Sequence, residues 1–207
     1  MKRLLYIIVV IVAIFASSCK KDLTSEDVSK ITTYPAYTLT GGSFYTALVS
    51  NQQFVDPGVK AAIGTKQYPV KTEGTVNLSI PDLYILNYST YSDEGFVWKA
   101  QRLVLITNSP ITQNYTGKYS RSGTVASIDL KTAYLGYYSM TTVWSGTTII
   151  PIEFVDLGGG DLKIVPGSTG YGRHEGTGKV QPNGDIWFTV TLLDQGPLTS
   201  VRKWTKS

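Results

Sequence analysis

An alternation of apolar and polar residues with a period of two, rather than a helical period, runs through this sequence after residue 34. In "IWFTVTL" (Ile186–Leu192) every second residue is apolar, so an extended chain would collect these side chains on one face. Turn signals separate such segments at a spacing of roughly 8–12 residues, which is typical of β-sandwiches. The pattern therefore predicts an all-β fold: a β-sandwich followed by a second antiparallel β-barrel or sandwich domain.

The first folded segment, residues 34–108, contains a long predicted hairpin over residues 84–106. Two strands, "YILNYSTYS" and "FVWKAQRLVLIT", flank the turn "SDEG" at Ser92–Gly95. A second turn is predicted at Asp56–Gly58, because Pro57 restricts φ and the following glycine tolerates a positive φ. "IPDLY" at Ile80–Tyr84 predicts entry into a strand in the manner of a tyrosine corner.

The second folded segment, residues 109–207, begins at the boundary signal Ser109-Pro110 and holds 14 of the 20 glycines. This glycine content indicates many tight turns. Two hairpins are expected, one at Gly158–Gly160 and one at Asn183-Gly184, a pair that favours a type I′ turn. A phosphate-binding role for the triple glycine is disfavoured, because a strand follows it where a helix would be needed. Six to eight strands and no helix are predicted here.

The N-terminus has the layout of a secretory signal. A basic pair, Lys2-Arg3, precedes the 12-residue apolar run "LLYIIVVIVAIF", and small residues then lead to Cys19. A spanning helix needs about 20 apolar residues, whereas a signal peptide needs roughly 7–15. Two alternatives remain open, namely ordinary secretion with a free cysteine and a short membrane anchor.

This segment resembles a bacterial lipoprotein signal with a lipobox, in the looser form found in lipoproteins of the Bacteroidetes. The resemblance implies a signal peptide at residues 1–18, lipid attachment at Cys19 and anchoring of the protein in a membrane. The polar residues 19–33 are expected to form a flexible tether. Lysines and acids soon after the cysteine are similar to signals that send such lipoproteins to the outer membrane and the cell surface, with a periplasmic orientation as the alternative.

Two further resemblances cover most of the remaining chain. "FVDPGVKA" (Phe54–Ala61) and the segment Glu73–Ile106 resemble bacterial immunoglobulin-like domains, which act as spacers or binding platforms. "GYYSMTTVW", "IPIEFVDLGGGDLKIVPGS" and "GTGKVQPNGDIWFTV" resemble the C-terminal domain of two-domain Bacteroidetes lipoproteins of unknown function. This resemblance implies an accessory lipoprotein, of a kind expected among glycan-uptake systems.

The charge and the scarce reactive residues exclude several functions. Without Lys2 and Arg3 the chain has 17 basic and 15 acidic residues, and no basic block follows Lys20-Lys21, so no nucleic-acid partner is expected. The single cysteine excludes an internal disulfide, and His174 as the only histidine excludes a multi-histidine metal site. No cofactor and no metal are predicted.

Aromatic side chains are the best candidates for a ligand site, because flat rings stack on sugar faces. Tyr138, Trp144, Tyr171 and Trp187 are the predicted ligand-binding residues. Tyr137 and Tyr138 must point to opposite faces of a strand, so one of them is expected outside, and Trp187 faces away from the Ile186 stripe. The alternative is that these rings cover a second sheet or an interdomain contact.

Catalysis is not predicted. The glycine-rich stretch Gly167–Gly178 is expected to be a flexible loop that carries His174 and Glu175, a pair that can do acid–base work only with a nucleophile or an orienting partner. Paired carboxylates for glycoside hydrolysis would have to come from common turn acids such as Glu153, Asp156 and Asp161. The sequence predicts a lipid-anchored, non-catalytic binding protein, with a glycan as the expected ligand. The rivals are an assembly subunit that binds another envelope protein and, third, a hydrolase.

Overall fold

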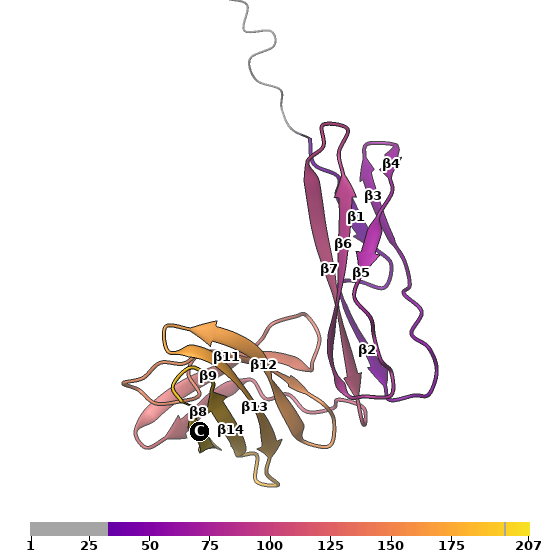
Figure 1. Cartoon of the computed structure of the whole chain (residues 1–207). Coiled ribbons are helices and arrows are strands. Elements are labelled where there is room, and N and C mark those ends of the chain that lie inside the picture. The colour runs from indigo at the N-terminus through magenta and orange to yellow at the C-terminus, as the bar shows by residue number, and fades with distance from the viewer. Residues whose placement is uncertain (1–32, 197) are drawn as a thin grey trace, which may run out of the picture. The chain divides into compact units, whose positions relative to one another are not determined.

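The computed structural model describes residues 33–196 and 198–207 (Figure 1). The predicted signal peptide, the lipid-attachment residue Cys19 and almost all of the predicted tether lie outside the described residues. Tyr34–Ser207 forms one compact unit. The described residues form strands and no helix, which confirms the predicted all-β class, and none of them belongs to a helix long and apolar enough to cross a bilayer.

The first seven strands form two sheets. One sheet has the order β1-β3-β4 and the other has the order β2-β7-β6-β5, in which β2 and β7 run parallel and the remaining neighbours are antiparallel. The strands are β1 (Ala36–Leu39), β2 (Phe44–Leu48), β3 (Val59–Ile63), β4 (Lys66–Tyr68), β5 (Lys71–Glu73), β6 (Asp82–Tyr91) and β7 (Val97–Thr107). The β6–β7 hairpin is the one predicted for residues 84–106.

The core of this sandwich joins the two sheets. Leu86, Tyr88 and Val104 of the β6–β7 hairpin are buried, and Tyr37 and Val59 of the facing sheet pack against them. The tyrosine-corner prediction is confirmed by its contact, because the Tyr84 hydroxyl donates a hydrogen bond to the Ile80 carbonyl at 3.0 Å. Burial alternates along much of β6 and along β7 as far as Val104, whereas residues 104–107 at the end of β7 are all buried.

A buried arginine holds the predicted Asp-Pro-Gly turn in place. Arg102, which is fully buried, donates to Asp56 Oδ1 at 2.7 Å and to the carbonyls of Thr40 and Gly58 at 2.7 and 3.0 Å. Tyr88 donates to the other Asp56 oxygen at 2.7 Å. A charge can be buried when it is paired and hydrogen-bonded in this way. The contact explains why an aspartate in the turn occurs together with an arginine in β7.

The last eight strands close into an antiparallel barrel with the order β10-β11-β12-β13-β14-β15-β8-β9 (Figure 1). The sequence left open whether this part is a barrel or a sandwich, and the structure decides for the barrel. The strands are β8 (Gly117–Arg121), β9 (Thr124–Leu130), β10 (Tyr137–Met140), β11 (Ile152–Asp156), β12 (Asp161–Thr169), β13 (Gly172–Val180), β14 (Ile186–Leu192) and β15 (Leu198–Lys206).

Side chains fill the interior of the barrel. Phe154, Phe188 and Trp204 are fully buried there, and the inward positions of β14 are the stripe predicted from Ile186–Leu192. β13 contributes glycine at two inward positions, and a Cβ on Gly178 would lie 2.7 Å from the Phe188 ring. Glycine is therefore required at this position so that the phenylalanine of the neighbouring strand can cover it.

Two local predictions in the barrel are wrong. Residues 167–178 are not a flexible loop, because β12 continues to Thr169 and β13 starts at Gly172, with ladder pairs along most of both strands. The turn at Asn183-Gly184 is not type I′, which would need a positive φ at both residues; only the glycine has one, at +87°. The Gly184 amide bonds the Gln181 carbonyl at 2.9 Å, which places Pro182 and Asn183 at the centre of the turn.

The split of the chain into residues 34–108 and 109–207 remains a prediction. The change of sheet occurs between Thr107 and Gly117, but contacts continue across it. Phe44 and Leu105 of the sandwich strands share a buried apolar cluster with Tyr137 and Val155 of the barrel strands. Lys163 and Asp82 also form an ion pair at 2.6 Å.

Candidate functional site

Tyr138 is not available to a ligand, which corrects the prediction for this residue. Its side chain is fully buried inside the barrel, stacks on Phe154 with 5.3 Å between ring centroids, and donates to the Gln113 carbonyl at 3.2 Å. Tyr137 does face the opposite way, yet it too is buried, because it packs near Phe44 in the cluster just described. Alternation predicted the two directions correctly but could not show that both faces are covered.

Trp144 is half-buried in the loop between β10 and β11, and other side chains contact its ring. It packs against the barrel core, and the Arg202 guanidinium carbon lies 3.5 Å from the ring centroid. Its carbonyl accepts a hydrogen bond from Arg121 Nη1 at 3.0 Å. An arginine therefore covers the Trp144 ring, which is not an open stacking surface for a ligand.

Tyr171 and Trp187 are exposed, but the structure does not bring them together. Tyr171 lies in the turn between β12 and β13 and is 40% exposed, and Trp187 lies near the start of β14 and is 39% exposed. Trp187 pairs with Lys179, seven residues along β13 from the Tyr171 turn, which corresponds to about 23 Å of strand. A ligand would therefore contact one of these rings at a time.

Trp187 stands in a groove of about 720 Å³ on the outer face of the barrel. Strands β12 to β15 and the β11–β12 turn supply the lining, which consists of Leu157, Asp161, Leu162, Thr177, Gly178, Lys179, Trp187, Thr189, Val201 and Lys203. The groove thus combines one large aromatic ring with hydroxyl, ammonium and carboxylate groups. Ligand sites of this kind use an apolar surface for contact area and a few polar groups for orientation.

The register of the strands places the charged groups on either side of the ring. Lys179 and Lys203 are the direct cross-strand neighbours of Trp187 on β13 and β15. Lys203 Nζ lies 4.1 Å from the ring centroid, while Lys179 Nζ pairs with Asp161 Oδ1 at 2.7 Å. The expectation that Trp187 points outward is confirmed, and the flanking lysines are residues that sequence reasoning missed. Their outward positions in the alternating pattern would have indicated them once the pairing of β14 with β15 was known.

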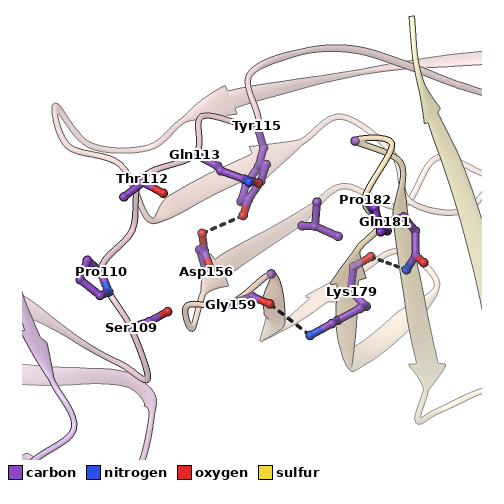
Figure 2. Close-up of a pocket in the computed structure, with 13 residues that line it drawn as sticks. Ser109, Pro110, Thr112, Gln113, Tyr115, Asp156, Gly159, Lys179, Gln181 and Pro182 are labelled. Atoms are coloured by element: carbon purple, nitrogen blue, oxygen red, sulfur yellow. Dashed lines mark hydrogen bonds between the residues drawn. The ribbon is translucent and has the colours of Figure 1, made fainter.

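A second pocket, of about 580 Å³, opens at one end of the barrel (Figure 2). It is lined by the segment from Ser109 to Tyr115, the β11–β12 turn and the β13–β14 turn. Asp156 is nearly fully buried there and accepts a hydrogen bond from Tyr115 at 2.9 Å (Figure 2). It also accepts one from the Gly158 amide at 2.8 Å. Lys179 Nζ contacts the Gly159 carbonyl at 3.2 Å on the opposite side.

Asp156 is the one perturbed carboxylate of this pocket. Burial raises its pKa above the ordinary aspartate range, the bonds from the Gly158 amide and Tyr115 oppose that shift, and the charge of Asp161 adds to it. Burial and the same contact raise the pKa of Tyr115. Since both Asp156 oxygens have protein donors, its geometry is that of a structural carboxylate that ties the β11–β12 turn to residue 115. Of the described residues that line the pocket, Asp156 alone is acidic.

His174 and Glu175 cannot act as a pair, which corrects the expectation of a shared loop. They are neighbours in β13, so His174 points into the barrel and is 3% exposed, whereas Glu175 points outward. Burial lowers the pKa of His174, and its Nδ1 has no hydrogen-bond partner among the described residues. The described part of the chain also contains no group of three or more His, Cys, Asp or Glu side chains placed to hold a metal ion.

The sequence and the structure were compared with known proteins. No family model matches the sequence, and no curated protein matches it. Among solved structures the chain is similar to the lipoprotein BT2262 from Bacteroides thetaiotaomicron, with 18% sequence identity and a TM-score of 0.39. The match covers 84% of this chain and 100% of that chain.

Proposed function

We propose that this protein is a lipid-anchored, non-catalytic envelope protein of the outer membrane that binds a glycan in the groove around Trp187. The observation that supports this proposal is a half-exposed indole in a groove that also presents threonine hydroxyls and charged side chains. An indole can cover the apolar face of a pyranose ring, while hydroxyl and charged groups bond the sugar hydroxyls. Trp187 supplies the first function when the sugar displaces Lys203 from the ring, and Thr177, Thr189 and Lys179 supply the second.

The acidic residues of this groove fit the binding of a sugar better than its hydrolysis. Among the described residues that line it, Asp161 is the single carboxylate, and it is already paired with Lys179. Glycoside hydrolysis generally needs two carboxylates about 5–10 Å apart across the scissile bond. The groove therefore has the groups to hold a sugar but not the acid pair that would cleave one.

A glycan-array screen of the full chain in non-ionic detergent tests the ligand class. We expect binding to at least one glycan, with a loss of about tenfold or more in affinity for Trp187→Ala, since ring stacking supplies most of the apolar contact. Phe96→Ala is the matched control, because Phe96 is an aromatic residue on the sandwich that is 51% exposed. Absence of binding to every glycan, or equal binding by wild type and Trp187→Ala, would contradict the proposal.

The proposed anchor is Cys19, and the polar segment behind it would hold the folded part away from the membrane. Each buried methylene of a lipid chain contributes about 0.8 kcal/mol, so several acyl chains give stable anchoring. Cys19→Ser should move the protein from the membrane fraction to the soluble fraction. Retention of the variant in the membrane would show that another segment anchors the chain. Protease treatment of whole cells then separates a cell-surface orientation from a periplasmic one.

A rival function as an assembly subunit has an observation of its own. At the tip of the β6–β7 hairpin the apolar residues Tyr91, Phe96 and Val97 are 61%, 51% and 43% exposed. Exposed apolar clusters mark contacts with protein partners when they are large enough. Crosslinking in cells with a photoreactive residue at position 96 tests this function; a specific protein adduct would favour it, and its absence together with glycan binding would favour the Trp187 groove.

A further inference from the structure

The ladder between β11 and β12 ends before the strands do. β11 pairs with β12 from Phe154 onward, but among the described residues Ile152 has a ladder partner only on β10. Continuing the register places Pro166 opposite Ile152, and a proline has no amide to donate, which explains why the pairing stops there. The same proline belongs to a two-residue bulge of β12 against β13. The barrel wall is therefore interrupted at this end of β12.

A hollow of about 390 Å³ lies at this interruption of the wall. Its lining includes Met140 and Ile152, which belong to the buried barrel core, and also Thr141 and Pro166, which are exposed. Because core and surface residues line the same hollow, it reaches from the outer surface to the buried side of the wall. His174 is also part of the lining.

The strand register accounts for the position of His174. It pairs with Leu192 of the barrel core on one side and with Gly167 on the other, so all three are on the inward face. A Cβ on Gly167 would lie 2.9 Å from His174 Nε2, so the glycine makes room for the imidazole. The residue is 3% exposed, and its Nδ1 has no hydrogen-bond partner among residues 33–196 and 198–207. Buried polar groups are generally hydrogen-bonded, so this nitrogen is available to a molecule in the hollow.

The charges around the hollow favour an uncharged ligand. Burial lowers the pKa of His174, which a contact with the Gly172 carbonyl opposes, so the imidazole is neutral at pH 7. Glu153 is the single acidic residue of the described lining, and Lys131 Nζ pairs with it at 2.7 Å. Burying an unpaired ion is costly, and this hollow offers a charged ligand no free partner of opposite sign.

The remaining lining combines apolar surface with hydroxyl groups. Met140 and Ile152 supply the apolar part, and Ser139 and Ser168 supply hydroxyls at the outer side. A neutral imidazole nitrogen is either a donor or an acceptor, and a secondary amide, which has one N–H and one carbonyl, can bond it in both cases. The volume is near the lower end of the range for small-molecule sites, about 300–1,000 Å³. A compact ligand with an amide and a small apolar group fits these features.

We propose that this hollow binds the N-acetyl group of a small uncharged ligand. The amide bonds His174, and the methyl group lies against Met140 and Ile152. An N-acetylated sugar and an N-acetylated amino acid both present this group. The hollow is a second site, separate from the Trp187 groove, because no residue of the described lining is shared between the two. The inference therefore does not depend on sugar binding at Trp187.

The single histidine of the chain makes the site directly observable by NMR. Labelling the full chain with ¹⁵N-histidine, in non-ionic detergent and with an affinity tag that contains no histidine, gives the imidazole nitrogen signals of His174 alone. The probes are N-acetylglucosamine, N-acetylalanine methylamide and glucose, which has no amide. We expect at least one acetylated probe to shift the Nδ1 signal with saturation. Glucose should bind about tenfold or more weakly, because it lacks the amide and the methyl group.

Two glycine variants locate the effect and keep the histidine signal. Gly167→Ala adds a methyl group that the imidazole must move to avoid, so affinity for the acetylated probe should fall about tenfold or more. Gly170→Ala, in the adjacent turn, is the matched control, because a Cβ there meets nothing within 4 Å. Neither glycine has a positive φ. Thermal unfolding curves show whether each variant is folded. If Gly167→Ala is not, His174→Phe, which keeps a flat ring but no ring nitrogen, should abolish binding in isothermal titration calorimetry.

The outcomes separate this site from the Trp187 groove. Binding of one acetylated probe alone supports the inference and identifies the source of the acetyl group, and a response that persists in Trp187→Ala confirms that the sites are independent. No response of the His174 signals to either acetylated probe, or equal binding of glucose, would overturn the inference. A response that Trp187→Ala removes and Gly167→Ala leaves unchanged would place binding at the Trp187 groove and also overturn it.

Discussion

Two arginines of this protein lie in opposite settings. Arg102, in the sandwich, is fully buried and bonded by Asp56 and by two backbone carbonyls, with Tyr88 bonded to the same aspartate. Arg202, in the barrel, is half-buried on the Trp144 ring beside Arg121, and none of the described carboxylates pairs with it. In the first setting the protein supplies acceptors for both Nη atoms; in the second an aromatic ring covers the guanidinium. The Nε of both arginines is buried without a hydrogen-bond partner among the described residues.

The difference shows how a structural charge can be told from a charge that is available to a ligand. Buried polar groups of folded proteins are generally hydrogen-bonded, so a satisfied cluster needs no further explanation. Asp156 with Tyr115 and Gly158 belongs to that class, even though it lies in a pocket. Arg202 does not, because none of the described carboxylates pairs with it and the Trp144 ring covers its guanidinium.

The largest expected effect is on the ion-paired arginine. Arg102→Met should lower the free energy of unfolding by about 3–5 kcal/mol, because it removes the cation paired with the Asp56 carboxylate and a donor to the Thr40 and Gly58 carbonyls. Denaturant unfolding followed by tryptophan fluorescence measures this change. The exposed Lys99→Met, on the same strand, should change stability by less than about 0.5 kcal/mol. A comparable loss in both variants would show that the buried pair is not special.

A smaller loss is expected at the barrel-end pocket. Asp156→Ala should lower the free energy of unfolding by about 2–4 kcal/mol, because the Tyr115 hydroxyl and the Gly158 amide would lose their acceptor. Asp156→Asn keeps an acceptor oxygen and should cost less than the alanine variant. Equal stability of wild type and Asp156→Ala would show that this carboxylate does not stabilise the fold.

The pH dependence of this group has a definite sign. Burial raises the pKa of Asp156, so the folded protein holds its proton more tightly than the unfolded chain does. The contribution of Asp156 to stability is therefore fully present below the ordinary aspartate pKa and is lost as the pH rises through its raised folded value. Relative to wild type, Asp156→Asn should gain stability as the pH increases from about 3 to about 7. Unfolding curves across this range measure the change. If Asp156→Asn instead lost stability relative to wild type, the direction assigned to the pKa shift would be wrong.

Removing the unpartnered arginine should have little effect on folding. Arg202→Met deletes a desolvated charge that faces Arg121 and keeps apolar contact with Trp144, so the free energy of unfolding should change by no more than about 1 kcal/mol. The melting temperature of the variant is the measurement. A loss comparable to that of Arg102→Met would show that Arg202 has a structural role and would weaken the contrast.

The smallest effect on stability is expected at Trp187. Because 39% of the residue remains exposed, Trp187→Ala should change the free energy of unfolding by about 1 kcal/mol or less while it removes sugar binding. Melting curves of Trp187→Ala measure the effect on stability, and the glycan array measures the effect on sugar binding. Unfolding of the variant would place Trp187 with the structural residues instead.

Much of the fold was predictable because strands and hairpins are local. The hairpin of residues 84–106, the turn at Gly158–Gly160 and the outward direction of Trp187 all follow from alternation and turn residues within short windows. The errors came from reading glycine as a sign of flexibility or of a standard turn. In residues 167–178 glycine instead makes room for a neighbouring strand, a requirement that depends on Phe188 and cannot be seen within the window itself.

The candidate site was predicted less well, because exposure depends on what covers each face. Tyr138 and Trp187 look alike as aromatic residues of predicted strands, yet one fills the barrel and the other lines a groove. Asp56 and Arg102 lie 46 residues apart in the chain, and only the packing of the two sheets brings them together.

By itself the sequence determined the all-β class, the hairpins, the alternation of faces and the expectation of a lipid anchor at Cys19, since each of these depends on neighbouring residues. The tertiary structure alone decided that eight strands close into a barrel, that Tyr138 is buried, and that Lys179 and Lys203 flank Trp187. The physical reason is that local periodicity sets the direction of a side chain, whereas strand order and register set its neighbours. Partners, burial and charge balance follow from those neighbours.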